Sequence, residues 1–497
     1  MENSMSKRFL VPLFLFAIFF IGMAIVQFAT PDMPDNDGFY HIKLAWLMRT
    51  EGLKPDFPWL PLSILNEAEF YDHHFLFHVA LIPFTFGNLR LGAKWAAVFF
   101  SAISFLAIWY LFHRQKVSFS WLWALALLGI SDAFLYRMSI TRAQSLSLAV
   151  LALGLAWILE GKYKHLAVLS FLYVWFYDAF PLIIAIAGLH FLAILLMERR
   201  LEFRPLLWAS IGIVAGLIIN PYFPNNLIFT WHHLLPKLTD ATSVSVGNEW
   251  YPYDTDQLLK NSLPALIAFV SGTFALGLSG RKMDVRTTTS FLIALLFGLM
   301  LFKARRFVEY FPPFALIFAA FTWSPLFADR QPASSSLKFS TLIQTNLTAI
   351  LLMLAVFAGI IKTIPATQRQ IADSKPYDLY GGASLWLMQN SSAGERVFQT
   401  DWDDFPRLFF YNTHNTYLAG LDPTYLQLYD SDLYDQWVGI TRGNIEKPSR
   451  LISEQFAARF VLTDLDHKSF LREAANDPGM VEVYRDGQAV IFEVLEP

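Results

Sequence analysis

The sequence contains no cysteine and few charged residues, and both shortages narrow what the chain can be. Without thiols it forms no disulfide and uses neither a thiolate metal ligand nor a cysteine nucleophile, so cysteine usage leaves the redox compartment open. Only 16% of its 497 residues are Asp, Glu, Lys or Arg, and the formal net charge is -3. This balance argues against a nucleic-acid partner and against a polybasic lipid-binding surface.

Apolar residues are abundant instead. They make up 55% of the chain, aromatic residues make up 16%, and the mean hydropathy is +0.39, which places the chain in a bilayer. Residues 9–31 carry no charge, and this run exceeds the roughly 20 apolar residues that cross a bilayer. Because the run is longer than a signal peptide's apolar core and no cleavage pattern follows it, we predict a retained first span.

Apolar runs recur along most of the chain and predict an α-helical polytopic membrane protein with about eleven transmembrane helices. The runs lie near 9–30, 95–112, 118–136, 143–159, 165–178, 180–197, 205–220, 261–279, 287–303, 308–327 and 340–362. Lys and Arg residues are concentrated in every second short loop, beginning with Lys7 and Arg8. By the positive-inside rule, the N-terminus is cytoplasmic and the C-terminus lies outside the cytoplasmic (inner) membrane.

The predicted topology gives a transmembrane domain over 1–363 with long outer loops at 31–94 and 221–260. Hydropathy falls in the tail, 364–497, which we predict to be a small mixed α/β extracytoplasmic domain. Strands are expected at 396–400 and 459–463, and a helix over 468–475. The stretch "VEVYRDGQAVIFEV" predicts a hairpin with its turn at Asp-Gly.

The first outer loop opens with an acidic cluster in "PDMPDNDGFY", which contains Asp32, Asp35 and Asp37, and a helix is expected directly after it. One interpretation is an Asp37 N-cap preceded by an Asx turn. The other is a catalytic carboxylate at the membrane boundary, where Asp35 helps Asp37 to bind a divalent cation.

The same loop continues with "EAEFYDHHFLFH", which contains Asp72, His73, His74 and His78. His74 and His78 are one helical turn apart, a spacing that suits a metal ion, but interfacial histidines more often only donate hydrogen bonds. We expect His73 and His74 to bind a phosphate rather than zinc.

Charged residues also stand at the predicted outer ends of later spans. Glu249 lies among aromatic residues in "GNEWYPY", and Arg305 and Arg306 in "KARRFVEY" run against the positive-inside bias. The arginines could simply snorkel to the headgroups. Alternatively, they form a guanidinium clamp for a lipid phosphate, with Arg137, Arg142, Asp132 and Asp178 lining the same cavity.

These segments together resemble the GT-C superfamily of integral-membrane glycosyltransferases, and most closely the catalytic subunit of oligosaccharyltransferase. The matching parts are "NDGFY" after an N-in first span, a Glu in the second long outer loop, an outward Arg near the last spans and an outer C-terminal domain. The likeness covers most of the chain as architecture but only short motifs as residues.

The resemblance implies roles for individual positions. It places the family's metal-binding or acceptor-activating Asp at Asp37, its loop Glu at Glu249 and its lipid-phosphate Arg at Arg305 or Arg306. The family's second acidic motif is replaced by "YRMSITRAQSL", and its WWDYG acceptor motif is echoed only by "TDWDDF", with Trp402, Asp403 and Asp404.

The sequence therefore predicts a glycosyltransferase that moves a sugar or oligosaccharide from a polyprenyl phosphate or pyrophosphate to a protein, lipid or glycan at the extracytoplasmic face. Asp37, Asp35 and Glu249 are the predicted catalytic residues. Asp37, Asp35 and Asp72 are the predicted ligands of a divalent cation, Mg²⁺ or Mn²⁺. The alternatives are a transporter or flippase of a lipid-linked sugar, and a polysaccharide ligase or polymerase that uses the same donor.

Overall fold

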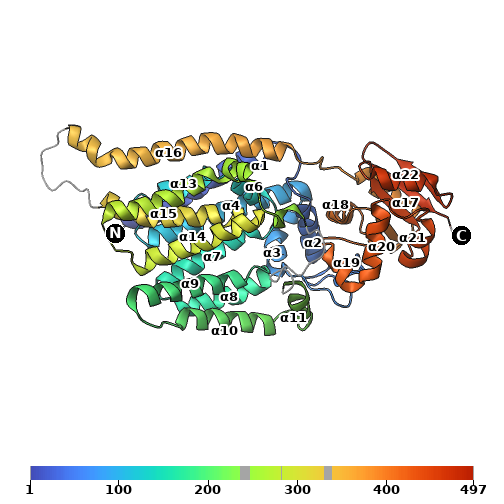
Figure 1. The fold of residues 1–497 in the computed structure, drawn as a ribbon, viewed down its shortest axis with the longest axis horizontal. Helices are drawn as coiled ribbons and strands as arrows, with labels where there is room; N and C mark the ends of the chain where they lie inside the picture. Colours follow the sequence, from blue (N-terminus) through green and yellow to red (C-terminus); the bar gives the residue numbers. More distant parts are fainter. Residues whose placement is uncertain (1, 235–246, 281, 329–338, 496–497) are drawn as a thin grey trace. The chain divides into compact units, whose positions relative to one another are not determined.

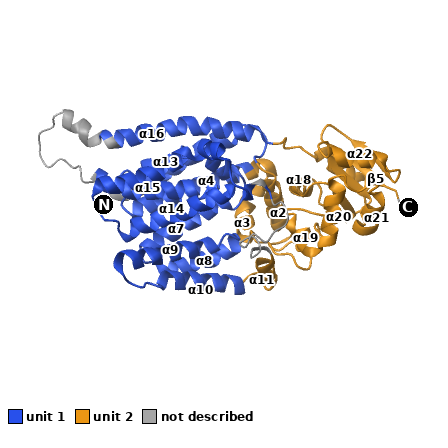
Figure 2. Cartoon of the chain, in the orientation of Figure 1, with its two compact units in different colours: residues 1–34, 94–219, 247–374 blue, residues 35–93, 220–246, 375–497 orange. Residues whose placement is uncertain are grey.

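The computed structural model describes residues 2–234, 247–280, 282–328 and 339–495 (Figure 1). The chain divides into two compact units that interleave along the sequence (Figure 2). Unit 1 contains residues 1–34, 94–219 and 247–374, and unit 2 contains residues 35–93, 220–246 and 375–497.

Unit 1 is a bundle of helices. Its long helices are α1 (Glu2–Gln27), α4 (Leu89–Arg114, from Lys94 on), α7 (Gln144–Leu159), α8 (Tyr163–Phe176), α9 (Pro181–Glu198), α10 (Arg204–Ile218), α13 (Thr255–Ser279), α14 (Val285–Lys303), α15 (Phe311–Ala328) and α16 (Phe339–Ala372). Helix α8 packs on α10, and α13 and α14 pack on α15. The apolar runs that the sequence shows from 143 to 362 each coincide with one of these helices, as do the runs near 9–30 and 95–112.

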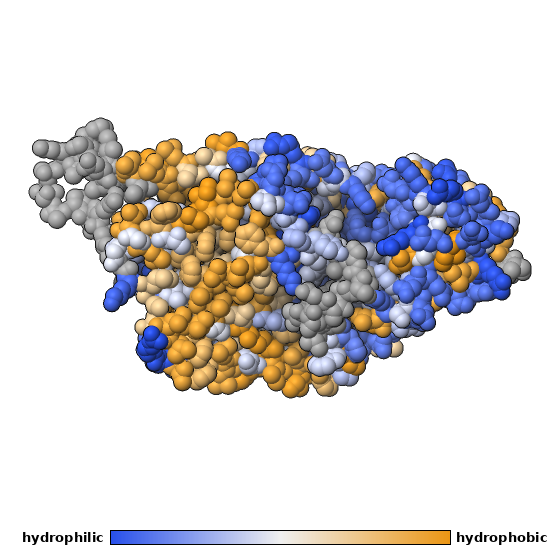
Figure 3. Space-filling model, viewed as in Figure 1, coloured by the Kyte–Doolittle hydropathy of each residue, from blue (hydrophilic) through white to orange (hydrophobic). Residues whose placement is uncertain are grey.

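Length and apolar composition make unit 1 a membrane-spanning unit. Within the described ranges, six helices are long and apolar enough to cross a bilayer, and seven if the bent pair α6 (Asp132–Ser139) and α7 counts as one span. Large apolar side chains are exposed on these helices, among them Phe14, Phe274 and Leu278. Figure 3 shows that the visible face of these helices is predominantly apolar. Since a water-exposed surface of this kind would be very costly, the chain is an integral membrane protein.

The run near 118–136 differs from the prediction because it is broken into α5 (Ser120–Leu125), the 3₁₀ turn η2 (Ala126–Leu128) and α6. Gly129 lies directly against the backbone of α16, where a Cβ atom would come within 2.6 Å of the Ile360 nitrogen. Only a glycine permits this close approach. Ser131 then caps the new helix, since its hydroxyl accepts a hydrogen bond from the Phe134 amide at 3.1 Å.

In unit 2, the two long loops that the sequence predicts to lie outside contribute α2 (Asp37–Glu51), α3 (Phe75–Leu81), the turn η1 (Ile82–Thr85), α11 (Asn225–Phe229) and the π-helical turn η3 (Thr230–Leu234). The expected helix after the acidic cluster is thereby confirmed. The first loop is joined to the tail by backbone bonds, because the Tyr417 amide donates to the Trp59 carbonyl at 2.9 Å. Helix α2 packs along α18 (Phe405–Tyr411) of the tail.

The tail forms a five-stranded sheet in the order β2-β1-β3-β5-β4. The strands are β1 (Arg396–Gln399), β2 (Thr416–Tyr417), β3 (Phe460–Asp464), β4 (Met480–Arg485) and β5 (Ala489–Val494). Strand β1 is parallel to β2 and β3, whereas β5 is antiparallel to β3 and β4. The predicted strands, the hairpin and the helix near 468–475, which is α22 (Lys468–Asn476), are all confirmed.

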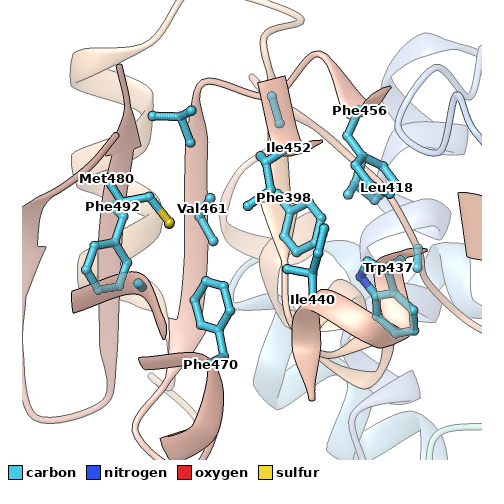
Figure 4. Close-up of a cluster of buried hydrophobic side chains, with 14 of the residues drawn as sticks. Phe398, Leu418, Trp437, Ile440, Ile452, Phe456, Val461, Phe470, Met480 and Phe492 are labelled. Atoms are coloured by element: carbon cyan, nitrogen blue, oxygen red, sulfur yellow. The ribbon is translucent and has the colours of Figure 1, made fainter. Parts of the chain in front are cut away.

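Side chains from alternate strand positions pack under helices on one face of this sheet (Figure 4). Phe398, Val461 and Phe492 of the sheet lie against Trp437 of α20 (Ser431–Thr441) and Phe470 of α22. The remaining helices of the tail are α17 (Gly381–Asn390), α19 (Thr424–Tyr429) and α21 (Ser449–Phe456). Trp386 of α17 contacts Phe460 and Tyr484 by its ring, so α17 covers the opposite face.

Candidate active site

Unit 1 contains a cluster of arginines around one carboxylate, which we call the arginine cluster: Arg137, Arg142, Arg306, Glu249 and Glu309. Glu249 belongs to the 3₁₀ turn η4 (Asn248–Trp250), and its Oε2 atom lies 3.0 Å from Arg137 Nη1 and 3.6 Å from Arg142 Nη1. Its Oε1 atom lies 3.7 Å from Arg306 Nη1. Three of the four predicted arginines therefore share one carboxylate.

Local backbone breaks bring these arginines together. Arg137 lies in the last turn of α6, and Arg142 lies in the short break where α6 and α7 bend by 109°. Arg306 and Glu309 are three residues apart in the 3₁₀ turn η5 (Arg305–Glu309). Residues at this spacing in a 3₁₀ helix project in the same direction. Arg137 consequently reaches Glu309 as well, with Nε 2.7 Å from its Oε1 atom.

Arg305 does not join the arginine cluster. Its Nε atom donates to the Pro252 carbonyl at 3.1 Å, and its guanidinium lies over the Tyr253 ring. Arg306, in contrast, stacks on Trp250 and donates from Nη2 to the Tyr177 hydroxyl at 3.1 Å. The geometry thus separates the two candidates that the sequence leaves equivalent.

The charges in the arginine cluster are preorganised and largely shielded from solvent. The side chains of Arg137, Arg306 and Arg142 are 12%, 17% and 19% exposed, which is too little for arginines that merely snorkel to water. Burial alone would raise the pKa of Glu249, but the charges of the three arginines outweigh it and hold that pKa well below its usual range. Asp178 adds a further negative charge near Arg306, so the cluster suits an anion through its three closely spaced guanidinium groups rather than through its net charge.

Unit 2 contains an acidic cluster, formed by Asp35, Asp37, Asp403 and Asp404 with Asn36 among them. Asn36 Nδ2 donates to Asp403 Oδ2 at 2.7 Å and to the Asp403 carbonyl at 3.1 Å. Asp403 and Asp404 belong to the turn η6 (Trp402–Asp404) of the tail. Two of the short motifs that the sequence singled out, "NDGFY" and "TDWDDF", therefore meet within one unit.

The interpretation of Asp37 as an N-cap is wrong in its detail. Asn36 occupies the N-cap position of α2, with φ -72 and ψ -38 and no side-chain capping bond, and Asp37 is the first helical residue. The expected Asx turn is present, since Asp35 Oδ1 accepts a hydrogen bond from the Asp37 amide at 2.8 Å. The Asp37 carboxylate lies in the first turn, where the helix dipole favours a negative charge.

Burial and like charges raise proton affinity on the tail side of the acidic cluster. Burial first, and then the charges of Asp37 and Asp35, raise the pKa of Asp403 well above its usual range. Burial, with the charge of Asp401, raises the pKa of Asp404 to about 7. The third residue of this motif, Trp402, packs against the core of the tail. A role for Trp402, Asp403 and Asp404 in acceptor binding stays a prediction.

The histidines of the first loop form a buried network with Asp72. Asp72 Oδ2 lies 2.8 Å from His78 Nδ1, and His78 Nε2 lies 2.7 Å from His41 Nδ1. Asp72 Oδ1 also accepts from the His74 amide at 3.0 Å. His73 stacks on Phe229. The predicted role of Asp72 as a metal ligand stays a prediction.

Across the described ranges, no group of three or more His, Asp or Glu side chains is arranged to hold a metal ion. Asp35 and Asp37 are two neighbouring carboxylates, which is the donor set that Mg²⁺ takes when a substrate phosphate and water supply the other ligands. These two residues fit a divalent cation, and the cation itself stays a prediction.

Two functional candidates were missed in the sequence. Arg407 is buried in α18 and reaches Asn36, and its signal was a single arginine inside the apolar stretch "FPRLFF". The Asp72–His78–His41 chain needed the packing of α2 against α3, which no local pattern shows.

Comparisons with known proteins give matches by structure alone. No family model and no curated protein sequence matches the chain. The oligosaccharyltransferase AglB from Archaeoglobus fulgidus, in complex with an inhibitory peptide and a dolichol-phosphate, superposes with a TM-score of 0.65 at 13% identity, over 95% of this chain and 72% of that one.

Two further glycosyltransferases match over nearly the whole chain. ArnT from Cupriavidus metallidurans bound to undecaprenyl phosphate gives a TM-score of 0.57 at 13% identity, over 98% of this chain and 99% of its own. The arabinofuranosyltransferase AftD from Mycobacteria gives 0.57 at 14% identity, over 97% of this chain and 40% of its own. The chain therefore has a GT-C-like fold, as the sequence predicted.

Proposed function

We propose that this protein is a membrane glycosyltransferase that transfers a sugar or oligosaccharide from a polyprenyl phosphate or pyrophosphate to an acceptor at the extracytoplasmic face. The observation that carries the proposal is the arginine cluster, a preorganised cationic site within a membrane-spanning unit. The fold supports it, because the similar structures include one in complex with dolichol-phosphate and one bound to undecaprenyl phosphate.

The arginine cluster has the chemistry to bind a lipid phosphate. Arg142 and Arg306 are 3.6 and 3.7 Å from Glu249, longer than a direct hydrogen bond, so a phosphate that approaches more closely would compete for their donors. Arg137 is more tightly paired with Glu249 and Glu309 and would keep the other two in place. The charge that develops on the departing phosphate is stabilised by the same guanidinium groups.

Asp37 supplies the base in this scheme. The acceptor's nucleophilic atom forms the new bond to the anomeric carbon of the sugar while the bond from that carbon to the phosphate oxygen breaks, with inversion of configuration. The acceptor's proton passes to the Asp37 carboxylate, and the phosphate leaves as an anion. Since phosphate is already a good leaving group, no acid is needed, and positioning carries most of the catalysis. Asp37 and Asp35 would hold a divalent cation, which would neutralise phosphate charge.

The orientation in the membrane is part of the proposal and can be measured directly. Because the chain has no cysteine, single-cysteine variants report one site each. We expect a membrane-impermeant maleimide to label Ser392→Cys, at an exposed position of the tail, on spheroplasts, in which the inner membrane is intact and its outer surface is accessible. We expect it to label Glu198→Cys, at the end of α9, only after the spheroplasts are lysed. The reverse pattern would place the active site on the cytoplasmic side.

The decisive experiment for the function is a transfer assay. Purified full-length protein is incubated with radiolabelled prenyl-phosphate sugars, with and without Mg²⁺ or Mn²⁺, and release of the sugar from the lipid is measured. Release that requires the protein and Asp37 supports the proposal. Failure to release sugar from any polyprenyl-linked donor would contradict it.

One observation favours a second candidate, a transporter of lipid-linked sugars. The bent pair α6–α7 is either a broken span or a re-entrant loop, with arginines beside the break, and broken helices are typical of transport sites. Under this alternative the donor crosses the bilayer of a reconstituted vesicle but keeps its sugar. Measuring sugar release and transbilayer movement on the same vesicles separates the two functions.

A further inference from the structure

The buried side chain of Arg407 joins the tail to the acidic loop of unit 2. Arg407 lies in α18 with 1% of its surface exposed, and its Nε atom donates to Asn36 Oδ1 at 2.7 Å. Its Nη1 atom donates to the Pro376 carbonyl at 2.6 Å, and its guanidinium stacks on Phe39 of α2. The remaining contact, from Nη2 to the Lys375 carbonyl, is 3.4 Å.

None of these hydrogen bonds goes to a carboxylate. A guanidinium buried against an amide and carbonyl groups costs free energy, and an apolar side chain of similar size would usually pack there at lower cost. An arginine differs from such an apolar side chain because its planar guanidinium holds several hydrogen-bond donors in a fixed arrangement. The charges of Asp403 and Asp404 nearby offset part of this cost, and the same arrangement fixes Asn36.

The orientation of the Asn36 amide follows from this contact. Arginine only donates hydrogen bonds, so the atom facing Arg407 must be the oxygen of Asn36. The Asn36 Nδ2 group therefore faces Asp403 and donates to both its carboxylate and its carbonyl. Asn36 is thus held from two sides by the tail segment 403–407.

Asn36 makes these contacts instead of capping α2 with its side chain. Asn is among the preferred N-cap residues, and a side-chain cap stabilises the helix. Here Asn36 occupies the N-cap of α2 without a capping bond. The residue that follows it is Asp37, so a shift of Asn36 moves the proposed catalytic carboxylate with it.

We infer that Arg407 and Asp403 are positioning residues, which clamp Asn36 and thereby hold the Asp37 carboxylate in its reactive place. The inference rests on the proposed function for the role of Asp37. It gives the tail a part in catalysis without contact with the sugar, and it gives Asp403 a role other than binding the acceptor.

The first test changes Asn36 and its two partners, Arg407 and Asp403. Asn36→Asp removes the Nδ2 donor that bonds the Asp403 carboxylate and carbonyl, so we expect kcat to fall about 10- to 100-fold while KM for the donor changes less than about twofold. Arg407→Lys loses the planar donor and should act in the same way. The double variant Asn36→Asp/Asp403→Asn restores a donor opposite an acceptor and should recover most of the lost kcat. Arg459→Lys, at an exposed position directly before β3, is the matched control with unchanged activity.

The second test does not depend on turnover. Hydrogen exchange of the first-turn amides of α2 should be faster in Arg407→Lys and Asn36→Asp than in the wild type, and close to the wild-type rate in the double variant. Thermal unfolding shows whether each variant is folded. Equal exchange in the wild type and folded single variants, or no recovery in the double variant, overturns the inference. If the wild type transfers no sugar, the proposed function fails, and hydrogen exchange still decides the positioning role.

Discussion

The arginine cluster of unit 1 and the acidic cluster of unit 2 shift the pKa values of their carboxyl groups in opposite directions. In the arginine cluster, cations surround Glu249 and hold its pKa well below its usual range. In the acidic cluster, burial and neighbouring carboxylates raise the pKa of Asp403 well above its usual range and that of Asp404 to about 7. Two buried carboxylates therefore differ through their neighbours: the arginine charges keep Glu249 ionised, whereas burial and then like charges favour the protonated form of Asp403.

The difference also matches the different roles proposed for the two clusters. A site of three guanidinium groups suits an anionic donor, whereas a carboxylate in the first turn of α2, Asp37, suits an acceptor group that must give up a proton. We therefore expect substitutions in the arginine cluster to lower the affinity for the donor, and substitutions in the acidic cluster to lower the turnover.

The largest effect is expected from Asp37→Asn. Loss of a general base costs about 10²- to 10⁴-fold in rate, so transfer should fall to background while donor affinity stays near the wild-type value. The measurement is sugar release at saturating donor, together with donor binding. Asp56→Asn is the matched control, because Asp56 is an exposed carboxylate of the same loop. Undiminished turnover in Asp37→Asn would remove Asp37 from the mechanism.

The next effect separates two adjacent arginines. Arg306→Gln removes a charged donor from the arginine cluster, and a hydrogen bond to a charged group is worth about 1.5–3 kcal/mol, so donor affinity should fall about 10- to 100-fold. Arg305→Gln should weaken it much less, since Arg305 contacts Pro252 and Tyr253 instead. Equal losses in a titration with prenyl phosphate would show that the cluster is not the phosphate site.

A third change tests the centre of the arginine cluster. Glu249→Gln leaves three guanidinium groups around a neutral amide, and we expect the ligand-free protein to lose on the order of 3 kcal/mol of stability. A bound prenyl phosphate replaces the missing negative charge, so it should raise the melting temperature of Glu249→Gln more than that of the wild type. A variant as stable as the wild type without ligand would argue against Glu249 as the shared counter-ion.

The smallest effect concerns pH. The pKa of Asp404 is about 7 in the folded protein and 3.8 in an unperturbed carboxyl, so between these values the folded state binds the proton more strongly than the unfolded state. Stability therefore falls as pH rises through this window and is level above it. Asp404→Asn lacks this contribution, so its melting temperature should decline less from pH 5 to pH 8 than that of the wild type. Parallel declines would show that Asp404 titrates normally.

Much of this architecture was visible in the sequence because it depends on local patterns. The long apolar runs predicted the helices of unit 1, and alternation with an Asp-Gly turn predicted the hairpin β4–β5. The charged residues Glu249, Arg137 and Arg306 stood out because charges are rare near membrane spans.

The missed features depend on contacts between distant parts of the chain. Arg407 and Asn36 are 371 residues apart, and nothing in either segment shows that they meet. The close approach of Gly129 to α16, at the break near 118–136, is a tertiary feature that hydropathy does not contain. Arg305 and Arg306 are adjacent and equivalent in sequence. Their side chains have different partners because they leave the turn η5 in different directions.

The most direct test of the central claim compares the affinity of the purified full-length protein for a prenyl phosphate with its affinity for the prenol of the same chain length. The two lipids differ only in the group that the arginine cluster is proposed to bind. We predict that the wild type binds the phosphate at least about tenfold more tightly, and that Arg142→Gln/Arg306→Gln removes this preference without weakening prenol binding. Equal affinity of the wild type for both lipids would contradict the account.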